Sequence, residues 1–484
     1  MDYLDLTISD IHKALLQNKV TPLELVKEAI KRAKSDTNNC FEYISEKEAF
    51  EQVSKLNNKD KNNPLWGIPF VIKDNFSTKG IPTTGSSNLL NDYIPCFDSE
   101  AYSRLINAGG ILIGKTTLDE LAMGGLGSSG HKGKTFNPYD PTHQRIIGGS
   151  SCGSASATCA AIVPLGIGSD TGDSVRKPAS YSGLVGFKPT WGRISRYGLF
   201  PFAVSLDHVA YFTRSVEDAA IVLEILAGKD DKDLTSADIP VKDYKNALNP
   251  CISSLKIAVI DEIINSISDK QIIAKFNNSL DYLKTQGATI NHVSIDLRLL
   301  RALQPSYFII SSSEGTSSNA NLDGIKYGLK EDGKDYEEIM IKTRTKGFSE
   351  PLKRRFIIGA YSLLKENQKD IFVRAQKARR LIVQVVDRIL SENDCIYLPA
   401  SPSVAPRFDQ KIDALSDDFL IANNHLVIGN FGGYPSLTLP LGKIDNLPFG
   451  VNVTGRRFDE QTVFNISLAI EQYTGLKNLS IKGK

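Results

Sequence analysis

Neither sign of charge dominates this chain of 484 residues, because 57 lysines and arginines stand against 55 aspartates and glutamates, for a net charge of +2. A chain with this balance has no overall field that would draw it to nucleic acid or to an anionic membrane. If RNA takes part in its function, a local patch or another subunit has to supply most of the positive charge. Hydrophobic residues make up 41% and charged residues 23%, which is typical of a soluble globular protein.

Long hydrophobic runs and targeting signals are also missing. No apolar run reaches the roughly 20 residues that a membrane helix needs. The start, MDYLDLTISD, has acidic residues where a secretory signal has basic and apolar ones. We therefore expect no membrane partner and a cytoplasmic location, or an organelle matrix reached without a visible transit peptide.

Cysteine is scarce, and its spacing excludes the usual structural roles. The chain has six cysteines, and none of them form a CxxC pair. Without paired spacings, neither a zinc site nor a disulfide framework is indicated. The simplest prediction is reduced thiols and no metal site.

Short apolar segments alternate with helical ones between residues 66 and 228, with glycine-rich turns between them. This alternation predicts an α/β fold in which one large, mixed and mostly parallel sheet is covered by helices on both faces. We expect a single domain, 1–484, made of a helical N-terminal strap (1–60), a catalytic core (66–228), a mostly helical insertion with substrate contacts (229–393), and C-terminal strands and a helix that complete the core (394–484). Within the strap, Thr21-Pro22-Leu23-Glu24 has the form of a capping box and predicts a helix that runs to Lys34.

Three short motifs match known signatures only in form. Residues 125–130, GLGSSG, fit GxGxxG, but a dinucleotide site needs a strand before the motif and a helix after it, and neither is indicated here. Ser129 and Lys132 form an SxxK pair without the companion motifs of β-lactamases. Ser151 is the centre of a GxSxG pattern, and His425 follows in the permitted order, but the segment before Ser151 is a poor strand.

One lysine ends an apolar segment. Lys73 is the last residue of WGIPFVIK, where Ile68, Phe70 and Ile72 predict a buried strand. A buried lysine is costly unless it is neutral or paired. From the residues alone, Lys73 is either ion-paired with Asp74 or another acid at the strand end, or a base whose pKa has been lowered by burial.

The longest pattern, residues 148–214, holds two serine clusters, GGSSCGS and DTGDSVRKPA. Together with GIPFVIKDN, and in the same order, these segments resemble the amidase-signature family of serine amidases. Four other segments resemble one group within that family, the A subunits of glutamyl-tRNA(Gln) and aspartyl-tRNA(Asn) amidotransferases: KPTWGRISRYGLFPFAVSLDHV, SSSEGTSSNANLDGIKYG, LKRRFIIGAYSL and GVNVTGRRFDEQTVFNISLAIEQYTG. The resemblance covers essentially the whole chain.

The resemblance implies a catalytic triad. Ser174 would be the nucleophile, Ser150 the proton relay with a cis peptide bond from Gly149, and Lys73 the base. A serine hydroxyl is a weak nucleophile and needs a base within hydrogen-bond reach. Lysine can act as that base only if its pKa falls from about 10.4 toward neutrality, which a buried position can bring about.

The resemblance also implies the roles of the loop around the nucleophile. The backbone N–H groups of Thr171, Gly172 and Asp173 would form an oxyanion hole. A structural salt bridge between Asp170 and Arg176 would hold the loop in place.

Three positions depart from the pattern of the family. Asp173 stands where glycine is usual, and its carboxylate would oppose a developing oxyanion unless it points away, as we expect. Asn423 stands where A subunits usually have the aspartate that contacts the substrate's α-ammonium, and Arg354 or Arg355 is the candidate for its α-carboxylate. Cys152 replaces another glycine and is interpreted as a small residue at the start of a buried helix rather than as a nucleophile.

The activity implied by the resemblance is hydrolysis of the side-chain amide of glutamine. The ammonia would pass to the B subunit of an amidotransferase, which converts Glu-tRNA(Gln) to Gln-tRNA(Gln) with ATP and Mg²⁺ and binds most of the tRNA. A small C subunit would link the other two, and this chain would need no cofactor of its own. Two alternatives remain open: a free-standing serine amidase that acts on other amides, and a structural subunit whose catalysis is impaired by Asp173.

Overall fold

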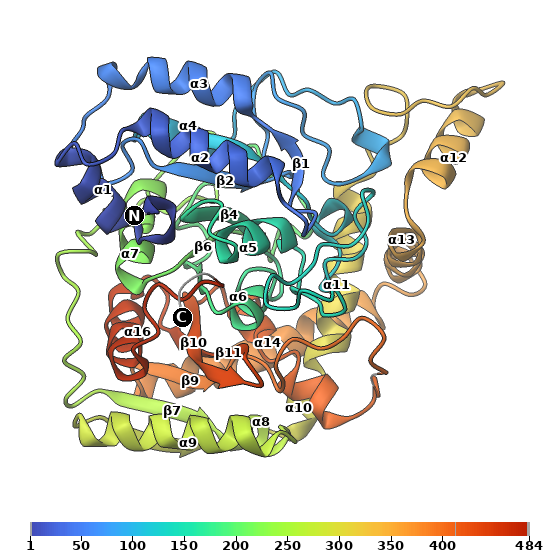
Figure 1. Cartoon of the computed structure of the whole chain (residues 1–484). Coiled ribbons are helices and arrows are strands. Elements are labelled where there is room, and N and C mark those ends of the chain that lie inside the picture. Colours follow the sequence, from blue (N-terminus) through green and yellow to red (C-terminus); the bar gives the residue numbers. More distant parts are fainter. Residues whose placement is uncertain (1, 412, 482–484) are drawn as a thin grey trace.

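One mixed sheet organises the molecule (Figure 1). The computed structural model describes residues 2–411 and 413–481. In this part of the chain, 11 strands pair in the order β1-β3-β2-β4-β6-β5-β10-β11-β9-β7-β8. The strands are β1 (Phe41–Ile44), β2 (Pro69–Lys73), β3 (Ile111–Thr116), β4 (Leu165–Asp170), β5 (Val185–Lys188), β6 (His208–Thr213), β7 (Lys256–Ile260), β8 (Thr289–Val293), β9 (Cys395–Pro399), β10 (Ser436–Ile444) and β11 (Leu447–Gly455).

Helices surround the sheet. They are α1 (Ile8–Leu16), α2 (Pro22–Lys34), α3 (Glu46–Ser54), α4 (Glu100–Asn107), α5 (Cys152–Cys159), α6 (Arg176–Ser182), α7 (Val216–Leu226), α8 (Asp261–Asn265), α9 (Lys270–Thr285), α10 (Leu297–Arg301), α11 (Leu303–Ser318), α12 (Tyr336–Gly347), α13 (Glu350–Leu363), α14 (Phe372–Glu392), α15 (Val427–Phe431) and α16 (Glu460–Thr474). No helix in the described residues is both long enough and apolar enough to cross a membrane.

The mixed α/β sheet is confirmed, but the expected majority of parallel pairs is wrong. Among the described strands, four pairs are parallel (β2–β3, β2–β4, β7–β8, β7–β9) and six are antiparallel (β1–β3, β4–β6, β5–β6, β5–β10, β10–β11, β9–β11). The C-terminal strands return through the centre of the sheet as a tight hairpin. Its two turn residues, Asp445 and Asn446, both have positive φ, 50° and 64°, the conformation that joins antiparallel strands most directly.

The two faces of the sheet are covered by different helices. In β6, Ala210 and Phe212 pack in a cluster with residues of α5 and α6. Val209 and Tyr211 instead belong to the main core, which includes residues of α7 and α16. Because successive side chains of a strand point to opposite faces, α5 and α6 cover one face and α7 and α16 cover the other.

The N-terminal strap folds largely as predicted. The N–H of Glu24 donates to the Thr21 hydroxyl at 3.2 Å, and the N–H of Thr21 donates to the Glu24 carboxylate at 2.8 Å, which completes the capping box of α2. The start of α1 is fixed to α7, because the N–H groups of Ile8 and Ser9 donate to the Asp218 carboxylate at 2.9 and 3.1 Å. The strap also contains β1, which pairs with β3 at the edge of the sheet.

Residues 229–393 are mostly helical, as expected, but they also extend the sheet. β7 and β8 lie within this segment, and β7 pairs with β9 from the C-terminal region. In Figure 1, α9 and β7 lie at the end of the molecule opposite α2 and α3, with α5, α6 and α16 between them. The segment is therefore part of the sheet architecture as well as a helical addition to it.

Candidate active site

A buried lysine is surrounded by three serine hydroxyls where β2 and β4 end side by side. Lys73 is the last residue of β2, and its side chain is fully buried. Its Nζ lies 2.8 Å from the Ser150 Oγ and 3.0 Å from the Ser151 Oγ. It also lies 2.9 Å from the Oγ of Ser169, near the end of the neighbouring strand β4. Burial lowers the pKa of Lys73 from its usual value to about 7.

The nearest acid in sequence does not pair with Lys73. The Asp74 carboxylate lies 3.2 Å from the Nζ of Lys115, and both side chains are fully buried. Asp74 also accepts hydrogen bonds from the N–H and the hydroxyl of Thr84, at 2.7 and 2.6 Å. The interpretation of Lys73 as an ion pair with Asp74 is therefore wrong, because Asp74 has a different cation.

The backbone before Ser150 passes very close to the carboxylate of Asp119. The peptide bond from Gly149 to Ser150 is cis. A Cβ on Gly149 would collide with the Asp119 carboxylate and come within 2.8 Å of the Gly127 nitrogen, so this position accepts only glycine. The Asp119 carboxylate accepts the N–H groups of Gly127 and Ser128, both at 2.9 Å. The GxGxxG segment thus wraps a carboxylate of the protein, and those N–H groups are not open to a phosphate.

The second serine cluster lies against the first. Ser174 stands in the loop between β4 and α6 and is buried. The N–H of Ser151 donates to the Ser174 carbonyl at 3.3 Å, which joins the start of α5 to this loop. The predicted salt bridge is present, with Arg176 Nη2 at 2.9 Å from Asp170 and both side chains fully buried. Burial raises the pKa of the Asp170 carboxyl, but the Arg176 charge outweighs it and holds the pKa well below its usual range.

The competing motifs do not form catalytic pairs. The Ser151 hydroxyl donates to the Ser169 carbonyl at 3.0 Å, and the ring of His425 contacts the Ala422 carbonyl instead. In the SxxK pair, Ser129 binds Asp119 and Lys132 pairs with Glu42. Cys152 begins α5 and is buried, and burial raises the pKa of its thiol to about 12.

The loop residues Thr171 and Gly172 are fixed by side chains from elsewhere. The Thr171 hydroxyl donates to the Asp207 carboxylate at 2.7 Å, and burial raises the pKa of Asp207 to about 6. A Cβ on Gly172 would lie 2.8 Å from the ring of Tyr307, so this tyrosine packs directly on the loop.

The carboxylate of Asp173 has a cation of its own. It lies 2.7 Å from the Nζ of Lys177, one helical turn further on, with the two side chains 21% and 8% exposed. The same Nζ donates to the carbonyl of Asn423 and, at 3.3 Å, to its Oδ1. Asp173 and Asn423, two of the departures noted in the sequence, therefore meet at one lysine.

The two candidate arginines are in different surroundings. Arg354 is exposed. Arg355 instead packs over the rings of Phe308 and Phe202, at 4.7 and 5.6 Å from the ring centroids. Its Nη1 is buried and has no hydrogen-bond partner among the described residues. Burial lowers the pKa of Arg355, and the nearby Tyr307 acts to raise it. Arg355 is thus the better candidate for an anionic group of a substrate.

A profile of the amidase family matches residues 24–464. The chain belongs to the amidase family. It is 37% identical over 480 residues to the A subunit of the glutamyl-tRNA(Gln) amidotransferase of Pediococcus pentosaceus, with 98% of each chain covered. It is 38% identical over 486 residues to the protein of the same name from Persephonella marina, again with 98% of each covered.

The structural comparison agrees with the sequence relatives. The crystal structure of the A subunit of glutamyl-tRNA(Gln) amidotransferase from Thermotoga maritima is similar to this amidase with a TM-score of 0.78 and 33% identity, over 98% of this chain and 96% of that one. Another solved structure, described as an amidase, has a TM-score of 0.81 and 26% identity, over 97% of this chain and 100% of that one. The expected family and amidase-signature fold are confirmed.

Several residues of the amidase site were not identified from the sequence. Lys177 lies within a segment that carries the family resemblance and Ser169 directly precedes it, but only their contacts reveal a role. Asn75, whose side-chain amide donates to the Ser169 hydroxyl at 3.1 Å, follows the strand of Lys73 by two residues. Tyr307 comes from the distant helix α11, and no local pattern connects it to the loop that it covers.

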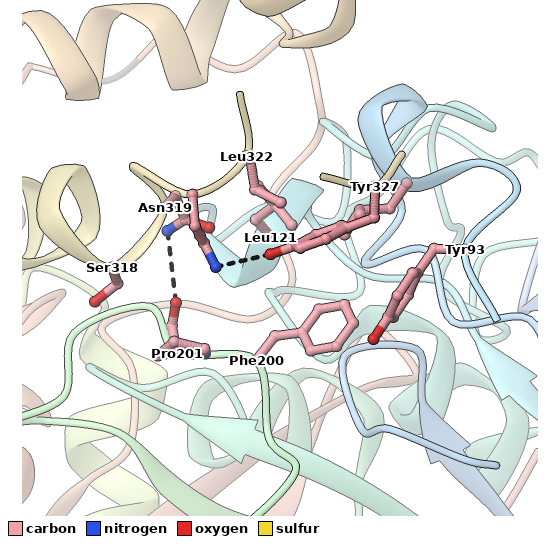
Figure 2. Close-up of a pocket in the computed structure, with 10 residues that line it drawn as sticks. Tyr93, Leu121, Phe200, Pro201, Ser318, Asn319, Leu322 and Tyr327 are labelled. Atoms are coloured by element: carbon pink, nitrogen blue, oxygen red, sulfur yellow. Dashed lines mark hydrogen bonds between the residues drawn. The ribbon is translucent and has the colours of Figure 1, made fainter. Parts of the chain in front are cut away.

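A separate cavity of about 90 Å³ lies near residue 121 (Figure 2). Tyr93, Phe200 and Tyr327 form an aromatic wall, and Asn319 and Asn321 bring amide groups to it. Its lining residues include none of the serines or lysines described above. In the described part of the amidase, no group of three or more His, Cys, Asp or Glu side chains is placed to hold a metal ion.

Proposed function

We propose that this amidase hydrolyses the side-chain amide of glutamine and supplies the ammonia to a tRNA-dependent amidotransferase. The observation that carries the proposal is the buried Lys73, with a pKa of about 7, at 2.8 Å from Ser150 and beside the Ser174 loop. A lysine of this kind is substantially neutral at physiological pH and can accept a proton. The relatives named as A subunits of glutamyl-tRNA(Gln) amidotransferases support this context.

The proposed reaction begins with activation of Ser174. Its hydroxyl proton passes to Ser150, whose own proton passes to Lys73, and the Ser174 oxygen attacks the amide carbon. The tetrahedral intermediate collapses when the proton returns from Lys73 to the amide nitrogen, the C–N bond breaks and ammonia leaves. Water then hydrolyses the glutamyl ester and regenerates Ser174, with glutamate as the second product.

The loop after β4 is proposed to stabilise the oxyanion. The N–H groups of Thr171, Gly172 and Asp173 are the candidates, because the loop is fixed on one side by Asp170 and Arg176. Donors of this type contribute about 3–4 kcal/mol to transition-state stabilisation in comparable sites. The ion pair with Lys177 reduces the effect of the Asp173 carboxylate on the developing charge, since it places a cation 2.7 Å away.

Arg355 is proposed to bind the α-carboxylate of glutamine. A buried guanidinium nitrogen without a partner is costly, and a carboxylate supplies the strongest kind of hydrogen bond for it. Tyr307 links the two regions, because it packs on Gly172 and its pKa, which burial raises, is lowered by the nearby Arg355 charge. Arg354, which is exposed, is not part of this proposal.

The partners are proposed from the relatives. Relatives named as A subunits imply further subunits, and we expect B and C subunits, with ATP, Mg²⁺ and most of the tRNA bound by the B subunit. The nearly neutral charge of this chain agrees with a tRNA site located mainly on a partner. No cofactor is required for the steps proposed at Lys73, Ser150 and Ser174.

The test is ammonia release from glutamine and from a simple aryl amide, with the chain alone and with co-expressed B and C subunits. Ser174→Ala is compared with wild type and with Ser391→Ala, which removes an exposed serine hydroxyl. We expect glutamine-dependent release that is lost only in Ser174→Ala. Release from the aryl amide alone would instead establish a free-standing amidase. Release from neither substrate would leave a structural subunit.

A further inference from the structure

Asp173 is next to the nucleophile in the chain, and its carboxylate has one ion pair. It immediately precedes Ser174, is 21% exposed, and uses its Oδ2 to contact Lys177 at 2.7 Å. A carboxylate offers two oxygens and about four acceptor positions, so one ion pair does not saturate it. This carboxylate can therefore bind a second cation without losing the first.

Lys177 is held independently of Asp173. Its Nζ also donates to the carbonyl and the side-chain oxygen of Asn423, from the C-terminal part of the chain. The Lys177 side chain is only 8% exposed, so it is held within the protein rather than free in solvent. Because Asn423 supplies neutral oxygens, Asp173 is the one negatively charged group among the described residues that contacts this lysine. Lys177 therefore orients the carboxylate without having to move when a ligand enters.

A charge of the opposite sign, that of Arg355, also lies near Tyr307. Tyr307 packs on Gly172. Burial raises the pKa of Tyr307, the Arg355 charge lowers it, and the Asp173 charge raises it. The surroundings of Tyr307 thus include both the Asp173 carboxylate and the Arg355 guanidinium, one nitrogen of which has no partner in the described part of the chain. A zwitterion, with one ammonium and one carboxylate, complements this arrangement better than a neutral amide does.

We propose that the Asp173 carboxylate, oriented by Lys177, receives the ammonium group of an α-amino-acid amide and so determines specificity. The inference rests on the proposed function, in which Arg355 takes the carboxylate of the same substrate. Asp173 then has two separate roles, with its backbone N–H directed at the oxyanion and its side chain directed at the ammonium. It selects zwitterionic amides over amides that lack an amino group.

The test separates binding from turnover. In the Ser174→Ala chain, with partner subunits where they are needed, the Kd is measured for glutamine and for 4-carbamoylbutanoate, which lacks the α-amino group. We expect Asp173→Asn to raise the Kd for glutamine about ten- to a hundredfold, as for a charge-assisted hydrogen bond, and to leave the other Kd unchanged. Asp231→Asn, at a 93% exposed carboxylate also paired with a lysine, should change neither.

A second variant, Asp173→Gly, tests the same role of the carboxylate in case Asp173→Asn disturbs folding. Asp173→Gly retains the backbone N–H and removes the carboxylate, and the same loss for glutamine alone is expected. Equal changes for both compounds, or no change for either, would overturn the assignment. If wild type releases no ammonia from glutamine, the proposed function fails, but the two Kd values still decide the role of Asp173. If the Ser174→Ala chain binds neither compound, both proposals fail.

Discussion

The side-chain nitrogen of Lys73 lies 2.8 Å from the hydroxyl oxygen of Ser150, and no carboxylate contacts it within ion-pair distance among the described residues. Another buried lysine, Lys115, provides the contrast, because it lies 3.2 Å from Asp74. Burial lowers the pKa of both lysines, to about 7 for Lys73, but Lys115 also has an adjacent carboxylate that favours its charged form. The difference in partners assigns a catalytic role to Lys73 and a structural role to Lys115.

Replacing Lys73 should remove activity without unfolding the protein. Lys73→Met eliminates the base and keeps an unbranched apolar side chain in a buried position. We expect ammonia release to fall by about a hundred- to ten-thousandfold, the range for loss of a general base. The melting temperature should stay at or above that of wild type, because an unpaired buried amine is lost. Both are measured on the same preparation.

The matched control is Lys115→Met. This change leaves the buried Asp74 carboxylate without its cation, which costs about 3–5 kcal/mol in comparable pairs. The melting temperature should therefore fall clearly. If Lys73→Met were the less stable of the two variants, Lys73 would be a structural residue rather than a base.

Ammonia release should depend on pH through the ionisation of Lys73. Only the neutral amine accepts a proton, and burial lowers the pKa of Lys73 to about 7. The value of kcat/KM should therefore rise with pH through about 7, and fall about tenfold per unit below it. The profile is measured with glutamine in saturating and limiting amounts. An acid limb near pH 4, or a rate that declines as pH rises through 7, would contradict the assignment.

Ser169 should tune the base rather than replace it. Its hydroxyl oxygen lies 2.9 Å from Lys73 Nζ and also accepts the Asn75 amide at 3.1 Å. In Ser169→Ala the ammonium form of Lys73 loses an acceptor, so its pKa should fall further. The acid limb of the profile should move to lower pH, and kcat should drop modestly because the amine is less firmly positioned. A limb that stays in place while kcat falls would indicate a structural effect.

The buried Asp170–Arg176 pair should contribute much more to the free energy of unfolding than a surface ion pair does. Asp170→Asn leaves the fully buried Arg176 without its anion, and the free energy of unfolding in urea should fall by about 3–5 kcal/mol. The control is Asp296→Asn, which breaks a pair whose arginine, Arg298, is 89% exposed and should cost about 0–1 kcal/mol. Similar losses in the two variants would show that the buried pair has no special role.

Cys152 should be dispensable. Its thiol has a pKa raised to about 12 by burial, so almost none is thiolate near neutral pH. Cys152→Ala keeps a small residue at the start of α5, and ammonia release should persist. Loss of activity in Cys152→Ala, with the melting temperature retained, would instead assign the nucleophile to this cysteine.

The local parts of the site could be predicted from the sequence. The apolar run before Lys73 indicated a buried strand end, and the burial and lowered pKa are present in the structure. The Asp170–Arg176 pair was implied by the family resemblance, which both residues carry within one short motif, and it is present in the structure. In each case the contacts lie within a few residues or at the end of a recognisable strand.

The remaining contacts depend on the tertiary fold. Lys177 meets Asn423 across 246 positions, and Tyr307 reaches Gly172 from another helix, so no periodicity marks either contact. The strand directions were misjudged for a related reason. β5, β6 and most of β10 are buried on both faces, which is the situation usual for parallel strands. The Asp445-Asn446 turn was the available signal for the antiparallel hairpin.

The most direct test of the account is the position of the acyl group during turnover. The amidase is quenched in acid while it hydrolyses glutamine, digested, and analysed by mass spectrometry for a glutamyl ester. We expect the ester on the peptide that contains Ser174, and none in Ser174→Ala. A glutamyl group on Ser150, Ser151 or Cys152 would contradict the assignment of Ser174 as the nucleophile and of Ser150 as its relay.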